Sequence, residues 1–189
     1  MPVRGKGFEQ AYNAQAGVDA GTMLVVGAGV TQAPNDKGQV EPMLQSLQQL
    51  QAKAPQLGTV ESLIADTGYC SEKNITACEQ AGVDPLMAVA RQEHHPHWSA
   101  RHSEPAPLQG NPSKVQRMAH RLKTKAGAAR YAVRKQTVEP VFGIIKSVLG
   151  FRQFSLRGLK KVRGEWTLVC LAWNLKRMAV LRLKTEKAA

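Results

Sequence analysis

A single aspartate stands where a buried strand is expected to end. In the stretch SLIADTGYCS, residues 62–71, an apolar run leads into Asp66, and Thr67-Gly68 then break the run. A carboxylate at the carboxyl end of a strand is well placed to bind a metal, because sites collect at these ends in α/β sheets. The same Asp-Thr-Gly sequence also suits an Asx-type turn. This segment alone leaves both interpretations open.

A second candidate carboxylate, Glu139, lies in a strongly basic segment. It is the only acidic residue between Glu104 and Glu165, so the plain alternative is that it only balances charge. On a helix, four residues would share one face: Lys135, Glu139, Phe142 and Lys146. A site that acts on phosphodiesters needs this mixture, because carboxylates hold Mg²⁺ and nearby cations position the phosphate. Pro140 disfavours the α conformation at Glu139, and we expect the helix to begin or kink there.

Two other patterns are weaker. The segment GAGVTQ, residues 27–32, has two glycines of a dinucleotide-binding fingerprint, but Gln32 replaces the third and turn residues follow it. Four histidines are close in sequence: His94, His95, His97 and His102. They lie in an aperiodic segment beside Pro96, with no cysteine at a zinc-finger spacing. We expect neither a dinucleotide site nor a metal site from these patterns.

The elements that would position Asp66 and Glu139 follow an α/β order. Short strands at 8–17 and 23–26 predict a hairpin that turns at Asp19-Ala20-Gly21. The further expected elements are a helix from Glu41 closed by Gly58, a buried strand at 60–65, a helix capped by Ser71 that runs through Ala81 and is ended by Gly82, a strand at 84–90, and helices over 114–149 and 165–183. This order predicts an α/β fold with a mixed sheet, in which an antiparallel pair joins strands connected through helices.

Two segments complete this outline. Residues 91–113 lack periodicity and hold four of the ten prolines, which predicts a loop or insertion. The last helix is expected to bury an apolar face made of Trp166, Leu168, Val169, Trp173, Leu175 and Met178. The basic residues between them are Arg163, Lys176 and Arg177. They are long enough to reach DNA, although surface cations of this kind usually only cover apolar surface.

Composition narrows the class of partner. The 189 residues fit one globular domain, with 43% hydrophobic and 21% charged residues. Residues 1–110 hold 7 Lys and Arg against 11 Asp and Glu, a net charge of −4, whereas residues 111–189 hold 19 against 3, a net charge of +16. This asymmetry favours nucleic acid as the partner of the second half, and a solvated basic face is the alternative.

The cysteines and the apolar segments indicate in which cellular compartment the protein is expected. The three cysteines form no C-x-x-C pair and no signal-peptide pattern follows Met1, which favours a reduced, cytoplasmic setting. The longest apolar candidate, residues 166–175, is too short to cross a membrane, so we expect no membrane partner.

At this point the motifs resemble a known family. Tyr131, Arg134, Glu139 and Lys146 spell Y-x2-R-x4-E-x6-K, which resembles the Tyr-Arg-Glu-Lys signature of DDE transposases from bacterial insertion sequences. ADTGYCS resembles that family's second-aspartate block, AYNAQAGVD the strand pair before it, and RGLKKVRGEWTLVCLAWNLKRM the closing helix. The resemblance covers nearly the whole chain. The gap between Arg134 and Glu139 is one residue longer than usual, which leaves Arg134 or Lys135 as the basic member.

The resemblance implies a ribonuclease-H-like fold whose carboxylate triad binds two divalent metals, Mg²⁺ or Mn²⁺. Asp66 and Glu139 would be the second and third carboxylates. Four other residues would hold backbone phosphates of double-stranded transposon-end DNA: Tyr131, Arg134, Lys135 and Lys146. The implied function is DNA transposition by strand cleavage and joining.

The family's first aspartate lies on a strand before the hairpin, and this chain offers no match for it. Glu9 and Asp19 are the only acids before residue 36, and neither is in register. We therefore expect residues 1–189 to be the C-terminal part of the catalytic domain, lacking its first strand and inactive or nearly so alone. The missing strand would leave a sheet edge open to association, either as a homodimer or with intact transposase.

Two other functions compete with this interpretation. The chain could be a basic DNA-binding protein that uses residues 114–163 without catalysis, or a ribosomal or RNA-binding surface. Aromatic residues are sparse in that segment, which argues against recognition of single strands.

Overall fold

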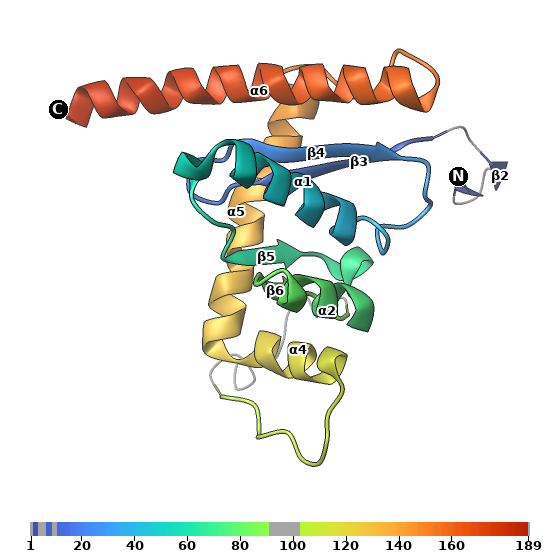
Figure 1. Cartoon of the computed structure of the whole chain (residues 1–189), viewed down its shortest axis with the longest axis vertical. Coiled ribbons are helices and arrows are strands. Elements are labelled where there is room, and N and C mark those ends of the chain that lie inside the picture. Colours follow the sequence, from blue (N-terminus) through green and yellow to red (C-terminus); the bar gives the residue numbers. More distant parts are fainter. Residues whose placement is uncertain (1, 4–6, 9–10, 91–102, 189) are drawn as a thin grey trace. The chain divides into compact units, whose positions relative to one another are not determined.

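The computed structural model describes residues 2–3, 7–8, 11–90 and 103–188, and within these ranges the chain forms two compact units. The first unit combines residues 1–35 with residues 135–189, and the second holds residues 36–134. The division falls inside one helix, α5 (Lys125–Ser147), which contributes to both units. Figure 1 traces the elements along the chain.

The first unit is built on the predicted hairpin. Strands β3 (Asn13–Val18) and β4 (Val25–Thr31) pair antiparallel from Asn13 opposite Thr31 to Val18 opposite Val25. The turn lies where it was predicted, because Asp19 accepts hydrogen bonds from the backbone N–H and the hydroxyl of Thr22. The predicted strand ends were wrong. Phe8 belongs to a separate short pair, β1 (Pro2–Val3) and β2 (Gly7–Phe8), and β4 runs on to Thr31.

Helix α6 (Leu159–Ala188) packs along this hairpin (Figure 1). The indole N–H of Trp166 donates to the Gln15 carbonyl at 2.9 Å, and that of Trp173 donates to the Met23 carbonyl at 2.8 Å. The Asn174 amide exchanges two hydrogen bonds of 2.8 Å with the backbone of Val25. These bonds satisfy buried polar groups while the helix covers an apolar core.

Three of the six residues that were predicted to form the buried apolar face of α6 are exposed. Trp166 and Trp173 are buried, but Leu168, Leu175 and Met178 are 66%, 59% and 53% exposed. The helix turns about 100° per residue, which places these three on the side away from the tryptophans. The core instead includes Val162 and Cys170, together with Val141 and Ile145 of α5.

The second unit contains a βαβ crossover. Strands β5 (Ser62–Ala65) and β6 (Asp84–Met87) pair in parallel and are joined through α2 (Glu72–Gln80). Two further helices pack here, α1 (Val40–Lys53) and α4 (Lys114–Lys123), with 3₁₀ turns η1 (Pro55–Leu57) and η2 (Thr67–Tyr69) between elements. The buried strand, its parallel partner and the intervening helix are confirmed.

Local start and stop signals explain this unit. The Ser71 hydroxyl accepts from the N–H of Asn74 at 3.2 Å, which is the predicted N-cap of α2. Gly82 adopts φ +70° where that helix ends, as predicted. Helix α1 ends at Lys53, earlier than predicted, because the η1 turn intervenes before Gly58.

The chain is mixed α/β, as predicted, but its sheets are small. Among the described residues the strands pair only as β1–β2, β3–β4 and β5–β6, so the single mixed sheet that we expected is not formed by them.

Helix α5 also corrects an expectation. It is helical throughout Lys125–Ser147 and so does not begin at Glu139. Pro140 lies inside this helix, where it removes one backbone N–H and its ring crowds the residue 136 carbonyl, so the kink expected there stays a prediction.

The predicted loop or insertion at 91–113 is only partly covered by the structure. Residues 91–102, including the four histidines, lie outside the described residues, and residues 103–113 hold no helix or strand. In the part of the chain that is described, no helix is long and apolar enough to span a bilayer.

Candidate metal and nucleic-acid site

Asp66 directly follows β5 and begins the η2 turn. Its Oδ1 accepts a hydrogen bond from the N–H of Gly68 at 2.9 Å, and its carbonyl accepts from the N–H of Tyr69 at 3.2 Å. The structure therefore contains the Asx-type turn that the sequence suggested. The turn fixes the half-buried carboxylate at the carboxyl end of a parallel strand, so it is compatible with a binding role as well.

The Asp36 side chain lies beside Gly68, as the Asp66 carboxylate does. A Cβ atom added to Gly68 would lie 2.8 Å from Oδ2 of Asp36 and 3.1 Å from Oδ1 of Asp66. The distance between the two oxygens is therefore no larger than the sum of these two distances. Both oxygens lie beside Gly68, which has no side chain. Sequence reasoning missed Asp36, because it lies in a turn-rich segment 30 positions from Asp66 and carries no local signal of this contact.

Asn74 ties the two carboxylate-bearing segments together. Its side chain is 1% exposed, and its Nδ2 donates to the carbonyl of Lys37 at 2.8 Å and to that of Tyr69 at 2.7 Å. Lys37 follows Asp36, and Tyr69 closes the η2 turn after Asp66. Both hydrogens of one buried amide therefore hold the turns side by side.

The thiols of the chain do not offer a competing nucleophile. Burial raises the pKa of Cys78 to about 11 and that of Cys170 to about 12. Burial also raises the pKa of Cys70, and the nearby Lys37 ammonium opposes this shift. Protonated thiols are poor nucleophiles and poor metal ligands.

The predicted DNA-binding residues all lie on α5. In the second unit, half-buried Tyr131 packs against the apolar core, and the guanidinium carbon of Arg134 lies 6.0 Å from the centre of its ring, within the range of a cation–π contact. In the first unit, Lys135, Glu139 and Lys146 are exposed along the second half of the helix.

The structure therefore brings together Tyr131 with Arg134, and Asp36 with Asp66. Glu139 belongs to the first unit and Asp66 to the second, so their pairing at one site stays a prediction. Among the described residues, no three or more His, Cys, Asp or Glu side chains gather as a metal-binding group.

Several cations of the basic half are already bound within the protein. Arg121 donates to both oxygens of Asp84 at 2.6 Å, and Arg130 donates to Oδ2 at 2.9 Å. The hydrogen bonds and charge of Arg121, aided by Arg130, hold the pKa of Asp84 below its ordinary value. In the first unit, Arg163 and Arg177 donate to the carbonyls of Val30 and Thr22, so both anchor α6.

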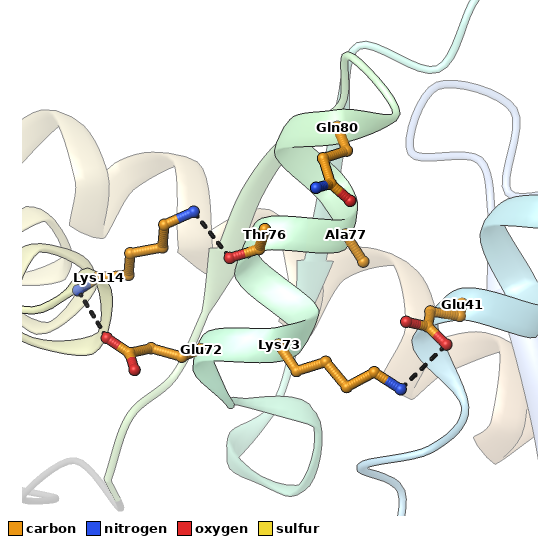
Figure 2. Close-up of a pocket in the computed structure, with 7 residues that line it drawn as sticks. All are labelled: Glu41, Glu72, Lys73, Thr76, Ala77, Gln80 and Lys114. Atoms are coloured by element: carbon orange, nitrogen blue, oxygen red, sulfur yellow. Dashed lines mark hydrogen bonds and ion pairs between the residues drawn. The ribbon is translucent and has the colours of Figure 1, made fainter.

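A pocket among the described residues is distinct from Asp66. It is an open hollow of about 510 Å³ on α1, α2 and α4 (Figure 2). Lys73 pairs with Glu41 at 3.2 Å, and Lys114 donates from Nζ to Thr76 at 2.7 Å and from its backbone N–H to Glu72 at 3.3 Å. Its charges satisfy one another, which favours a structural role.

Comparison with known proteins identifies one family. The sequence model of the family described as "Transposase DDE domain" matches residues 2–175. No match to the chain was found among curated proteins or among solved structures.

Proposed function

Because the chain belongs to the DDE transposase family, we propose that it serves DNA transposition, with Asp66 and Glu139 as metal-binding carboxylates. We further propose the branch of bacterial insertion sequences that carries the Tyr-Arg-Glu-Lys signature, and a ribonuclease-H-like domain. In the complete protein, the reaction would cut and join phosphodiesters at the ends of double-stranded transposon DNA. The observation that carries this proposal is the position of Asp66, held at the end of a parallel strand.

The residues around Asp66 fit a divalent metal. Carboxylate oxygens are the ligands that Mg²⁺ and Mn²⁺ prefer, and two of them border the space beside Gly68 that a Cβ would fill. When bound, such ions would activate the attacking oxygen and stabilise the leaving oxygen. The chain's own contribution would be to hold these carboxylates in a fixed position before DNA arrives.

The exposed cations of α5 would bind the DNA backbone. Lys135 and Lys146 flank Glu139 on one helix and are exposed, so phosphates could approach them without breaking internal ion pairs. Arg134 would offer a planar guanidinium to a phosphate, and its contact with the Tyr131 ring would orient it.

The first aspartate of a DDE triad is not supplied by the described residues of the hairpin. The Asp19 side chain is used to close the β3–β4 turn through Thr22, and Glu9 lies outside the described residues. We therefore propose that residues 1–189 form an incomplete catalytic domain with little or no strand-cutting activity alone. Association with a second copy or with intact transposase belongs to this proposal, since β3 and β5 each have one hydrogen-bonded neighbour among the described strands.

A salt titration of duplex DNA binding tests the DNA-binding surface. The variant Lys135→Gln/Lys146→Gln should bind a fluorescent duplex more weakly, and the slope of log K against log salt should fall by about 2, because each phosphate contact contributes about 0.9. The matched control Lys53→Gln/Lys73→Gln removes the same charge from exposed positions of α1 and α2. Equal losses in both variants would refute a surface on α5, and tighter binding of RNA than of duplex DNA at the same salt would favour an RNA-binding function.

A non-catalytic DNA-binding protein is the second candidate, and the use of Asp19 in its turn favours it. The variant Asp66→Asn separates the two. Loss of divalent-metal binding with DNA binding retained supports the metal-dependent function, whereas a chain that binds duplex DNA but no metal supports the second candidate.

A further inference from the structure

We propose that Asp36 is an additional metal-binding carboxylate, acting beside Asp66 on the same divalent ion. This inference rests on the proposed function, because the ion is the one that the transposase chemistry would use. Asp36 is not part of the sequence signature, and only the folded chain brings it to Asp66.

The first step of the argument is the meeting point at Gly68. Oδ2 of Asp36 and Oδ1 of Asp66 lie 2.8 Å and 3.1 Å from the position that a Cβ of Gly68 would occupy. Two oxygens on one Mg²⁺ each lie about 2.1 Å from the ion. Two oxygens on one ion therefore lie at most about 4.2 Å apart, so the two carboxylates, which both reach the Gly68 position, would turn toward each other to share one ion or a water bound to it.

The second step is the way in which the two turns are held. Asp36 begins a turn in which its carbonyl accepts from the N–H of Gln39 at 3.0 Å. The buried Asn74 amide fixes this turn to the Asp66 turn through the Lys37 and Tyr69 carbonyls. A ligand set works best when the groups behind it are rigid. We therefore assign Asn74 as the positioning residue of the pair.

The third step concerns the donor atoms. One oxygen of Asp36 and one of Asp66 border the same position at Gly68, and carboxylate oxygens are the ligands that Mg²⁺ and Mn²⁺ prefer.

Titration of the purified 189-residue chain with Mn²⁺, followed by the electron paramagnetic resonance signal of the free ion, tests this inference. Asp36→Asn and Asp66→Asn should each raise the dissociation constant about tenfold or more. The double variant should bind little more weakly than either single variant, because both residues serve one ion. Glu61→Gln, an exposed carboxylate in the same unit, is the matched control and should bind as the unmodified chain does.

Thermal melting separates binding from folding. Asp36→Asn should melt close to the unmodified chain in EDTA but lose most of the rise in melting temperature that Mn²⁺ produces. If that variant does not fold, Asp36→Glu keeps the charge while moving the oxygens by one methylene, and its Mn²⁺ affinity should still fall.

The outcomes distinguish this inference from the proposed function. Unchanged Mn²⁺ affinity in Asp36→Asn, with loss in Asp66→Asn, would overturn the role of Asp36 and leave the proposed function standing. A chain that binds no Mn²⁺, or that binds it equally well without Asp66, would overturn both.

Discussion

Replacing Asn74 by leucine should destabilise the second unit by about 2–4 kcal/mol. The side chain is 1% exposed and donates hydrogen bonds of 2.8 Å and 2.7 Å to the carbonyls of Lys37 and Tyr69. Leucine is close to asparagine in size, so the main loss is two part-buried carbonyls without this donor, at about 1–2 kcal/mol each. With a urea slope of about 2 kcal/mol/M, the midpoint of unfolding should fall by about 1–2 M.

Urea unfolding followed by circular dichroism measures this change, and hydrogen exchange locates it. Amide protection should fall in β5, α2 and β6, while β3, β4 and α6 keep theirs because they belong to the first unit. Gln80→Leu is the control, because Gln80 is exposed on the same helix and should shift stability by no more than about 0.5 kcal/mol. Equal stability of the two variants would refute the reasoning that Asn74 holds the two turns together.

Two further predictions concern charge and space in the second unit. Gly68→Ala should destabilise the second unit by about 1 kcal/mol or more, because the new Cβ would lie 2.8 Å from Oδ2 of Asp36, 3.1 Å from Oδ1 of Asp66 and 3.4 Å from Cβ of Asp36. Mn²⁺ affinity should fall as well, since the two carboxylates must move apart; unchanged affinity would argue against a shared ion. Asp84→Asn should lower stability at pH 7 by about 1 kcal/mol, a value kept small by solvent screening. The pKa of Asp84 is lowered in the folded chain, so the ionised carboxylate stabilises the fold above its unfolded pKa, and this stabilisation disappears as the pH falls below about 4. Below that pH, the urea midpoints of the variant and the unmodified chain should converge.

The elements near Asp66 could be predicted because their signals are local. The apolar run before Asp66, the Ser71 cap and Gly82 each specify a strand end, a helix start and a helix stop without reference to the rest of the chain. The structure confirms all three. The Asx-type turn was likewise present in the Asp-Thr-Gly sequence.

The buried side of α6 could not be predicted in the same way. Leu168, Leu175 and Met178 are as apolar as the residues that are buried, so hydrophobicity alone does not say which side packs on the hairpin. The side is chosen by the indole and amide hydrogen bonds of Trp166, Trp173 and Asn174 to the hairpin backbone. These are tertiary contacts between residues about 150 positions apart.

The meeting of Asp36 with Asp66 lay beyond sequence reasoning for the same physical cause. It depends on the Asn74 amide reaching two carbonyls of different turns. In the sequence, Asn74 stands out only by its position three residues after the helix cap Ser71, and an asparagine there does not indicate side-chain hydrogen bonds to two other turns.

The net charge of +16 in residues 111–189 is larger than the number of positive charges available to bind DNA phosphates. Arg121 and Arg130 are bound to Asp84, and Arg163 and Arg177 to carbonyls of the hairpin. Arg121 and Arg130 gain little from a phosphate, because they must give up the Asp84 carboxylate first, whereas Arg163 and Arg177 use only their Nε–H in these bonds. Lys135 and Lys146, on both sides of Glu139, are exposed, and no ion pair is recorded for them among the described residues. If these lysines bind DNA, the backbone they hold would lie next to Glu139, so DNA affinity and metal chemistry would depend on the same helix.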